Sequence, residues 1–173
     1  HYLAVLFPDN ELKIMGYNRV VKDLNGLTAA ELLEKAAEKF EVAEGPAAPE
    51  SAHQFGMFLD SKWYRLTAKD GSFPANDPVE GLDVAILQSN LLTPLLGIGD
   101  PRTDNRIDFV GGIRGTDELE RRCGLDAAVA FSCYPVSVEQ LMTIADADAI
   151  MPPKSTWFEP KLRSGVVVRS LKG

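Results

Sequence analysis

The sequence contains few of the residues that metal sites, disulfide scaffolds and membrane spans require. It has two cysteines, Cys123 and Cys133, and two histidines, His1 and His53. Zinc sites use three or four Cys, His or acidic ligands at close spacing, so we expect no structural zinc. Two thiols with no CxxC spacing suit the reduced state and a cytoplasmic protein. No apolar run reaches the roughly 18 residues of a membrane span, and no signal peptide is recognisable.

An excess of positive charge is also missing. Lys and Arg total 18, and Asp and Glu total 25, which gives a formal net charge of -7. An acidic protein repels phosphate backbones and anionic lipid surfaces at long range, so we expect neither a nucleic acid nor a membrane as a partner. A local basic pocket for a small anion is compatible with this total, because the net charge is a sum over the whole surface.

What is present is the composition of an ordinary globular domain, with 45% hydrophobic and 25% charged residues. A chain of this length buries roughly two thirds of its unfolded surface without any covalent cross-link. We therefore expect a single domain over residues 1–173. Because the first residue is His1 and an apolar stretch follows it at once, we expect this domain to be the C-terminal fragment of a longer protein.

Local patterns predict strands and helices in mixed order. Capping boxes at Thr28–Glu31 and Ser137–Gln140 predict two helix starts, and alternation between turn residues predicts strands. Residues 44–51, rich in Gly, Pro and Ala, predict a flexible internal loop. The order predicts an α+β fold with a mixed or largely antiparallel sheet covered by helices. The expected strands are 2–7 and 11–15 as a hairpin, 19–23, 54–59, 62–67, 107–110, 127–133 and 166–168, and the expected helices are 28–40, 82–96 with a kink at Pro94, 116–122 and 137–147.

The densest set of candidate binding residues lies near the C-terminus, between Pro153 and Gly165. Cations neutralise an anion and hydroxyls supply short hydrogen bonds to its oxygens, so this set suits a phosphate or a carboxylate. The glycines that precede a Lys-Ser-Thr sequence in a P-loop are missing here, which excludes that motif. The alternative is a proline-rigidified surface loop with solvated cations. The candidate residues are Lys154, Ser155, Thr156, Lys161 and Arg163.

Three further cations are candidates for the wall of the same pocket. Arg19 and Lys22 share one expected strand, where they point to opposite faces unless the strand bends. Solvated strand charges are the alternative for both. Arg114 follows a glycine pair and precedes a helix start, where free amides can bind an anion. The acidic residues of the 100–106 loop lack EF-hand spacing, and a turn held by local Asp and Asn hydrogen bonds explains them better than a magnesium site does.

No nucleophile or general base stands out in the sequence. Cys133 lies in an apolar strand pattern, where burial raises the pKa of a thiol. Cys123 lies near a helix end, where the helix dipole disfavours a thiolate. His53, at the start of an expected strand, is more typical of a surface histidine than of a base. The sequence therefore assigns no catalytic residue and no cofactor.

Several segments look familiar and extend over nearly the whole chain: 17–24, 55–57 with 63–66, 100–104, 107–112 and 150–165. Together they resemble the C-terminal part of DUF1015, a bacterial family of unknown function. The resemblance implies that an N-terminal half is missing. In the family this half carries an Asp-Gly-His-His-Arg motif that is similar to the nucleotide-handling motif of the ParB and sulfiredoxin superfamily, and the motif is absent here.

Two hypotheses of function follow. In the first, the chain is the C-terminal domain of an enzyme-like protein that binds a small anionic metabolite, either a phosphorylated compound or a nucleotide. The full-length protein would be a phosphotransferase, and the fragment alone would have no turnover, because the chemistry needs the histidines of the missing half. In the second, the chain is a structural or interaction module that packs on the missing half or forms a homodimer. Such a module would expose an apolar patch of several hundred Å².

Overall fold

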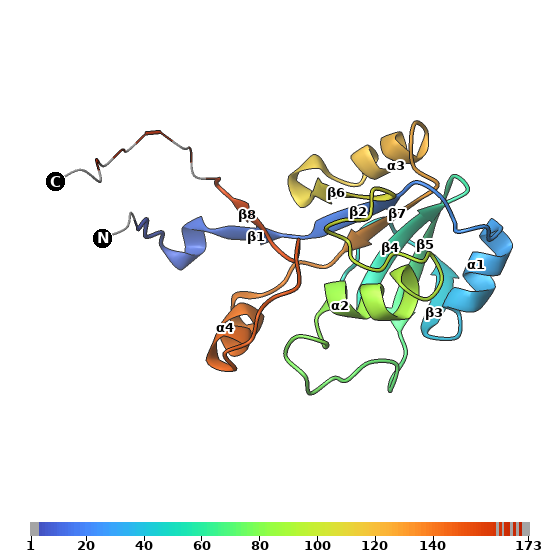
Figure 1. The fold of residues 1–173 in the computed structure, drawn as a ribbon, viewed down its shortest axis with the longest axis horizontal. Helices are drawn as coiled ribbons and strands as arrows, with labels where there is room; N and C mark the ends of the chain where they lie inside the picture. The colour runs from blue at the N-terminus through green and yellow to red at the C-terminus, as the bar shows by residue number, and fades with distance from the viewer. Residues whose placement is uncertain (1–3, 162, 164, 167, 169, 171–173) are drawn as a thin grey trace.

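The computed structural model describes residues 4–161, 163, 165, 166, 168 and 170 (Figure 1). It confirms the α+β class, and every strand pair in the described chain is antiparallel. The strands are β1 (Lys13–Met15), β2 (Tyr17–Val21), β3 (Phe40–Glu44), β4 (Gln54–Leu59), β5 (Lys62–Ala68), β6 (Ile107–Gly111), β7 (Val129–Cys133) and β8 (Trp157–Glu159). The helices are α1 (Ala29–Ala36), α2 (Asp83–Leu87) with its π-helical continuation η2 (Gln88–Leu92), α3 (Asp117–Cys123) and α4 (Val138–Asp146), with short 3-10 turns at η1 (Asp9–Glu11) and η3 (Gly112–Arg114).

Six strands form one sheet in the order β3-β5-β4-β7-β2-β6. Side chains alternate between the two faces of each strand. One face, which includes Val21, Met57 and Phe131, carries the main core, and residues of α1, α2 and η2 complete that core. The opposite face places Val20 and Ala130 against α3. Neighbouring residues of β2 therefore face different sides of the molecule.

β1 and β8 form a separate two-stranded sheet that projects from the end of the large sheet (Figure 1). We call this pair the β1–β8 arm. Lys13 pairs with Glu159 and Met15 with Trp157. Gly16 alone separates β1 from β2, so the arm directly extends β2. A Cβ atom at Gly16 would lie 2.1 Å from the carbonyl oxygen of Cys133, so the close approach of β7 requires glycine at this position.

Helix α4 packs at the base of the arm, against the start of α2. Its buried Ile144 belongs to a small cluster with Leu82 and Val84. The chain after α4 then returns to the sheet and carries residues 152–156 to β8. None of the helices in the described part of the chain has the length and hydrophobicity of a membrane span.

Both predicted capping boxes are confirmed. In α1, the Thr28 hydroxyl accepts the Glu31 N–H, and the Glu31 carboxylate accepts the Thr28 N–H. Ser137 and Gln140 make the same reciprocal pair at the start of α4. The β4–β5 hairpin also forms with its predicted strands. These features succeed because their signals are local in sequence.

The predicted N-terminal hairpin is wrong. Residues 4–7, the described part of its first strand, lie in no helix or strand. β1 pairs instead with β8, from the other end of the chain. The turn residues at 8–10 indicated a local return, but they form a 3-10 turn that leads into the arm.

Two helix ends also differ from the prediction. The first helix ends at Ala36, because Phe40 pairs with Ala68 and opens β3. The helix that begins at Asp83 ends at Leu92, with Thr93 still in helical conformation as its C-cap, and does not continue through Pro94. The predicted strand at 166–168 includes a residue outside the described part of the chain.

Candidate functional site

Arg19 is a charged residue that lies almost wholly inside the protein. It occupies the middle of β2, on the face that carries the main core, and only 3% of its surface is exposed. Its Nη1 donates to the Tyr17 carbonyl oxygen and to Cys133 Sγ at 3.4 Å, and its Nη2 donates to the Lys154 carbonyl oxygen at 3.3 Å. Three neighbours therefore fix the guanidinium group, and none of them carries a negative charge.

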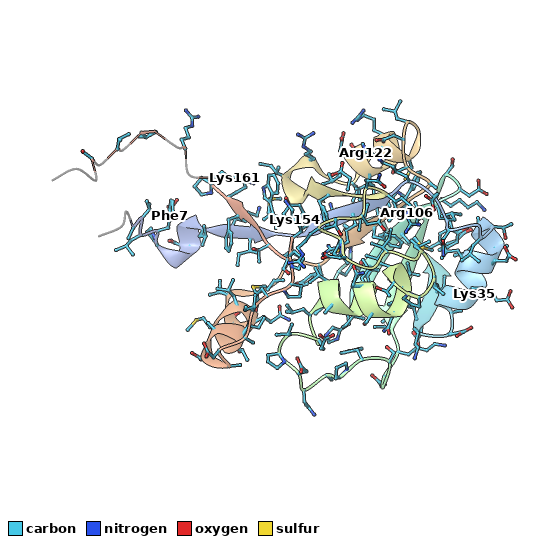
Figure 2. The ribbon with its side chains drawn as sticks, in the orientation of Figure 1. Phe7, Lys35, Arg106, Arg122, Lys154 and Lys161 are labelled. Carbon is cyan, nitrogen blue, oxygen red and sulfur yellow. The ribbon has the colours of Figure 1, made fainter. Side chains whose placement is uncertain are left out.

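Lys154 brings a second cation to the same place from the other end of the chain. It lies between α4 and β8 with a positive φ of 58°, in the left-handed region. Its Nζ lies 5.6 Å from the centroid of the Tyr17 ring and 5.8 Å from that of Phe109. The Arg19 Cζ lies 5.7 Å from the same Phe109 centroid. Figure 2 shows Lys154 where the arm meets the large sheet.

The two cations have no carboxylate partner among the described residues. The ion pairs that the structure describes all involve other arginines and lysines. Arg19 is buried, and a buried charge costs free energy unless it is paired. Its cation–π contact with Phe109 compensates a part of this cost, whereas Lys154 is exposed. The arrangement therefore favours an anion next to Arg19 and Lys154, which we call the Arg19–Lys154 site.

A hollow of about 200 Å³ opens beside Arg19 and can receive such an anion. Helix α2 and η2 form one wall and the Pro152–Pro153 turn forms another. Gln88 holds its position by donating to the carbonyl oxygen of Ile98 at 2.8 Å. One carboxylate, that of Glu80, lies in the lining. The lining consists of Arg19, Glu80, Val84, Ala85, Gln88, Ser89, Pro101, Pro152 and Pro153.

An aromatic cluster joins this site to the arm. The Tyr17 ring makes edge contacts with Phe109 and Trp157, with centroids 5.9 and 5.4 Å away. Trp157 lies over Gly111, where a Cβ atom would come within 2.4 Å of the indole. Lys161 Nζ lies 3.2 Å from the Trp157 centroid, so Gly111 and Lys161 both lie against this indole. The aromatic cluster thus fixes β8 against the sheet.

The remaining C-terminal candidates lie apart from Arg19. The buried Ser155 uses its hydroxyl to donate to the Pro152 carbonyl oxygen at 2.5 Å. Thr156 and Lys161 line a hollow of about 510 Å³ on the arm, and Figure 2 shows Lys161 farther out than Lys154. Arg163 is exposed. The structure therefore brings Lys154 to Arg19 and leaves the other predicted residues in the turn or on the arm.

The other two predicted cations lie elsewhere. Lys22 follows β2 directly and is exposed. Its charge contributes to the lowered pKa of Asp126, although Arg122 has the larger effect. Arg114 is exposed and lies 3.9 Å from a Glu118 oxygen in an ion pair. Both cations lie near α3, whereas Arg19 faces α2.

The 100–106 loop is a turn held by its own side chains. Arg102 bonds both Asp100 oxygens, and Arg106 bonds both Asp104 oxygens. Arg106 also donates to the carbonyl oxygens of Leu96 and Gly97, so it fixes the chain that follows η2. Within the described part of the chain, no group of three or more His, Cys, Asp or Glu side chains could hold a metal ion.

Sequence reasoning missed a buried carboxyl group behind the site. Asp83 opens α2 with only 5% of its surface exposed, and its Oδ1 accepts the His53 N–H at 2.9 Å. Its Oδ2 is buried without a partner among the described residues. Burial raises the pKa of Asp83 to about 7. Because an Asp at a helix start is ordinarily an exposed capping residue, the local sequence gave no sign of this burial.

The two thiols are poor nucleophiles, as the sequence indicated. Burial raises the pKa of the Cys133 thiol, although the nearby charge of Arg19 opposes that shift. Burial, followed by the charge of Asp126, raises the pKa of Cys123 to about 11. The His53 ring packs on Phe73, with centroids 4.6 Å apart. The described residues at this site can thus bind an anion but offer no activated nucleophile.

Comparison with known proteins gives a family match over part of the chain and a resemblance in fold. Residues 1–85 of the 173 match the family model described as "Protein of unknown function (DUF1015)". No curated protein matches the chain.

Solved structures resemble this chain at low identity. A structure of a free serine kinase in complex with AMP matches with a TM-score of 0.50 and 16% identity, covering 87% of this chain and 55% of that chain. A mutant free serine kinase in complex with ADP matches with a TM-score of 0.47 and 20% identity, covering 87% and 55%. A conserved hypothetical protein from Pyrococcus furiosus has a TM-score of 0.49 and 16% identity, covering 87% and 57%. This likeness concerns the fold alone, and the chain spans little more than half the length of these proteins.

Proposed function

We propose that the whole chain belongs to the DUF1015 family and forms the part of an enzyme-like protein that holds the phosphate group of a small metabolite. A nucleotide is the preferred ligand. The observation that carries this proposal is the buried Arg19, a cation without a carboxylate partner in the described chain, which lines a hollow. Lys154 does not line this hollow, but its carbonyl oxygen accepts a hydrogen bond from Arg19, and the two cations lie 5.7 and 5.8 Å from the Phe109 centroid. A phosphate group supplies both the charge and the acceptor oxygens that these side chains need.

Two comparisons support this reading. The family match covers residues 1–85, which include Arg19. A solved protein with this fold is a free serine kinase bound to AMP, so the fold occurs in a protein that binds a nucleotide. Phosphoryl transfer is the reaction that we propose for the full protein. The described residues at the site bind and orient the ligand, and the groups that carry out the chemistry would come from outside this chain.

Replacing Lys154 tests the proposal directly. Lys154→Gln is expected to weaken binding of ADP and of inorganic pyrophosphate about tenfold, because a charged hydrogen bond contributes roughly 1.5–3 kcal/mol. Isothermal titration calorimetry measures the change. Lys35→Gln is the matched control, since Lys35 is an exposed lysine on α1, away from the site (Figure 2). Equal affinities of the two variants would contradict the proposal.

The arm favours a second candidate function, an interaction module. Val5, Leu6 and Phe7 are 46%, 93% and 37% exposed, and Phe7 lines the hollow of the arm with Leu12 and Phe158. Exposed apolar side chains that lie together indicate a surface that another protein covers. The covering protein would be the rest of a longer chain or a second copy of this one.

Analytical ultracentrifugation distinguishes a second copy of the chain from the rest of a longer chain as the protein that covers the arm. If a second copy covers the arm, the chain is expected to form dimers at high micromolar concentration, and Leu6→Lys is expected to abolish them by placing a charge in the apolar contact. A monomer at every concentration, with identical behaviour of Leu6→Lys, would contradict dimerisation through the arm. The pyrophosphate affinity of Leu6→Lys is expected to stay unchanged, because Leu6 lies outside the Arg19–Lys154 site.

A further inference from the structure

A second concave site lies on the other face of β2. Asn18 precedes Arg19 and therefore faces the α3 side of the sheet. It lines a cleft of about 360 Å³, which is within the range of small-molecule sites. The cleft is bounded by β1, by the end of β7, by residues 112–116 and by Ala48 and Pro49. We call it the Asn18 cleft.

Asn18 contributes a fixed hydrogen-bond donor to this cleft. Only 5% of its surface is exposed, and its Oδ1 accepts the Cys133 N–H at 3.1 Å. This bond sets the orientation of the amide, so the Nδ2 group is the part left to serve another partner. Within the described part of the chain, Nδ2 donates to no acceptor. Nδ2 is not among the buried unpaired atoms of the described chain, so it is open to the cleft, where a ligand oxygen can accept its N–H.

The charge of the lining selects for an anion. Lys13 is its one charged side chain, and no carboxylate lies in the lining, although the whole chain has a net charge of -7. Thr116 adds a hydroxyl that makes no helix-capping bond. The other walls are mostly apolar and include Ile14, Met15 and Pro135. The cleft thus combines one cation and neutral donors with an apolar body, a combination unlike that of the Arg19–Lys154 site.

We propose that the Asn18 cleft binds a small monocarboxylic acid with an apolar body. The carboxylate accepts the Asn18 Nδ2–H and lies near the Lys13 ammonium group, and the apolar part contacts Ile14, Met15 and Pro135. A phosphate dianion fits less well, because a single lysine faces it and apolar side chains make most of the wall. This site is separate from the proposed phosphate site, so either one can fail without the other.

Nuclear magnetic resonance of the ¹⁵N-labelled chain with benzoate as the probe tests this proposal. Benzoate is expected to shift the Asn18 side-chain amide resonance in a saturable way, with a dissociation constant of about a millimolar for so small a ligand. Lys13→Gln is expected to weaken this binding about fivefold. Ala48→Phe, at an exposed position on the rim, is expected to block it.

Two comparisons make the result decisive. Lys35→Gln, which removes an exposed lysine on α1, is expected to bind benzoate like the unmodified chain. Benzyl alcohol has the same ring without the charge and is expected to bind several-fold more weakly than benzoate. Shifts that stay linear to 20 mM benzoate, or equal affinities of Lys13→Gln and Lys35→Gln, would overturn the proposal. Such a result would leave the proposal of phosphate binding at the Arg19–Lys154 site untouched, because the two sites are separate.

Discussion

The Asp83→Asn variant is expected to be more stable than the unmodified chain at pH 8, by about 2 kcal/mol, and less stable than it by about the same amount below about pH 4. Asp83 is buried, and its Oδ2 has no partner among the described residues. Burial raises the pKa of this carboxyl from 3.8 to about 7. An uncharged side chain of the same shape avoids the cost of a buried charge.

The direction of the pH dependence follows from proton linkage. The pKa of Asp83 is higher in the folded chain than in the unfolded chain, so the folded state binds its proton more tightly. Its contribution to stability is fully present below pH 3.8 and is lost as the pH rises through about 7. A difference of about three pKa units corresponds to about 4 kcal/mol. The unpaired amide of Asn offsets part of that gain, which leaves about 2 kcal/mol.

Urea denaturation of both proteins between pH 4 and pH 8 measures this effect. Asp70→Asn is the matched control, because Asp70 is exposed in the turn after β5. The difference between the Asp83→Asn variant and the unmodified chain is expected to grow with pH, whereas Asp70→Asn is expected to show no such trend. A constant difference for Asp83→Asn across this range would show that the carboxyl group is ionised in the folded protein at every pH tested.

Gly111→Ala is expected to lower the free energy of unfolding by about 2–3 kcal/mol, an overpacking effect. The added Cβ atom would lie 2.4 Å from the Trp157 ring, so the indole must move. Trp157 fixes β8 through Tyr17, and the segment before β8 carries Lys154. The substitution is therefore also expected to weaken pyrophosphate binding, although residue 111 touches no ligand.

Gly124→Ala provides the comparison for this variant. Gly124 caps α3 with φ −78°, and its nearest contact would be an ordinary one of 3.5 Å. The free energy of unfolding of the Gly124→Ala variant is expected to differ from that of the unmodified chain by less than about 0.5 kcal/mol. Urea denaturation gives the free energies, and tryptophan fluorescence reports the movement of Trp157. Equal stabilities of the two alanine variants would mean that Trp157 does not lie on Gly111 in solution.

Local signals account for the parts of the fold that the sequence predicted. Capping pairs such as Thr28 with Glu31 act within one turn of helix, and the β4–β5 hairpin closes over a few residues. The arm was missed because β1 pairs with β8 across nearly the whole chain. No pattern around Lys13 identifies such a distant partner. Phe40 was misplaced for a similar reason, since its position suits a helical stripe and a strand equally well.

The candidate site was predictable in its chemistry but not in its geometry. The sequence indicated that Lys154 and Arg19 are candidate anion ligands, and strand alternation predicted opposite faces for Arg19 and Lys22. Which cations meet depends on the return of the chain after α4, and that path is a tertiary property. Asp83 gave no signal, because only burial distinguishes it from an ordinary polar residue at a helix start.

A crystal structure of the chain with bound ADP tests the central claim most directly. The account predicts a phosphate group in the hollow beside α2, within hydrogen-bond distance of both the Arg19 guanidinium group and Lys154 Nζ. Density for the phosphates at any other place, with these two side chains still against Phe109 and free of the nucleotide, would contradict it.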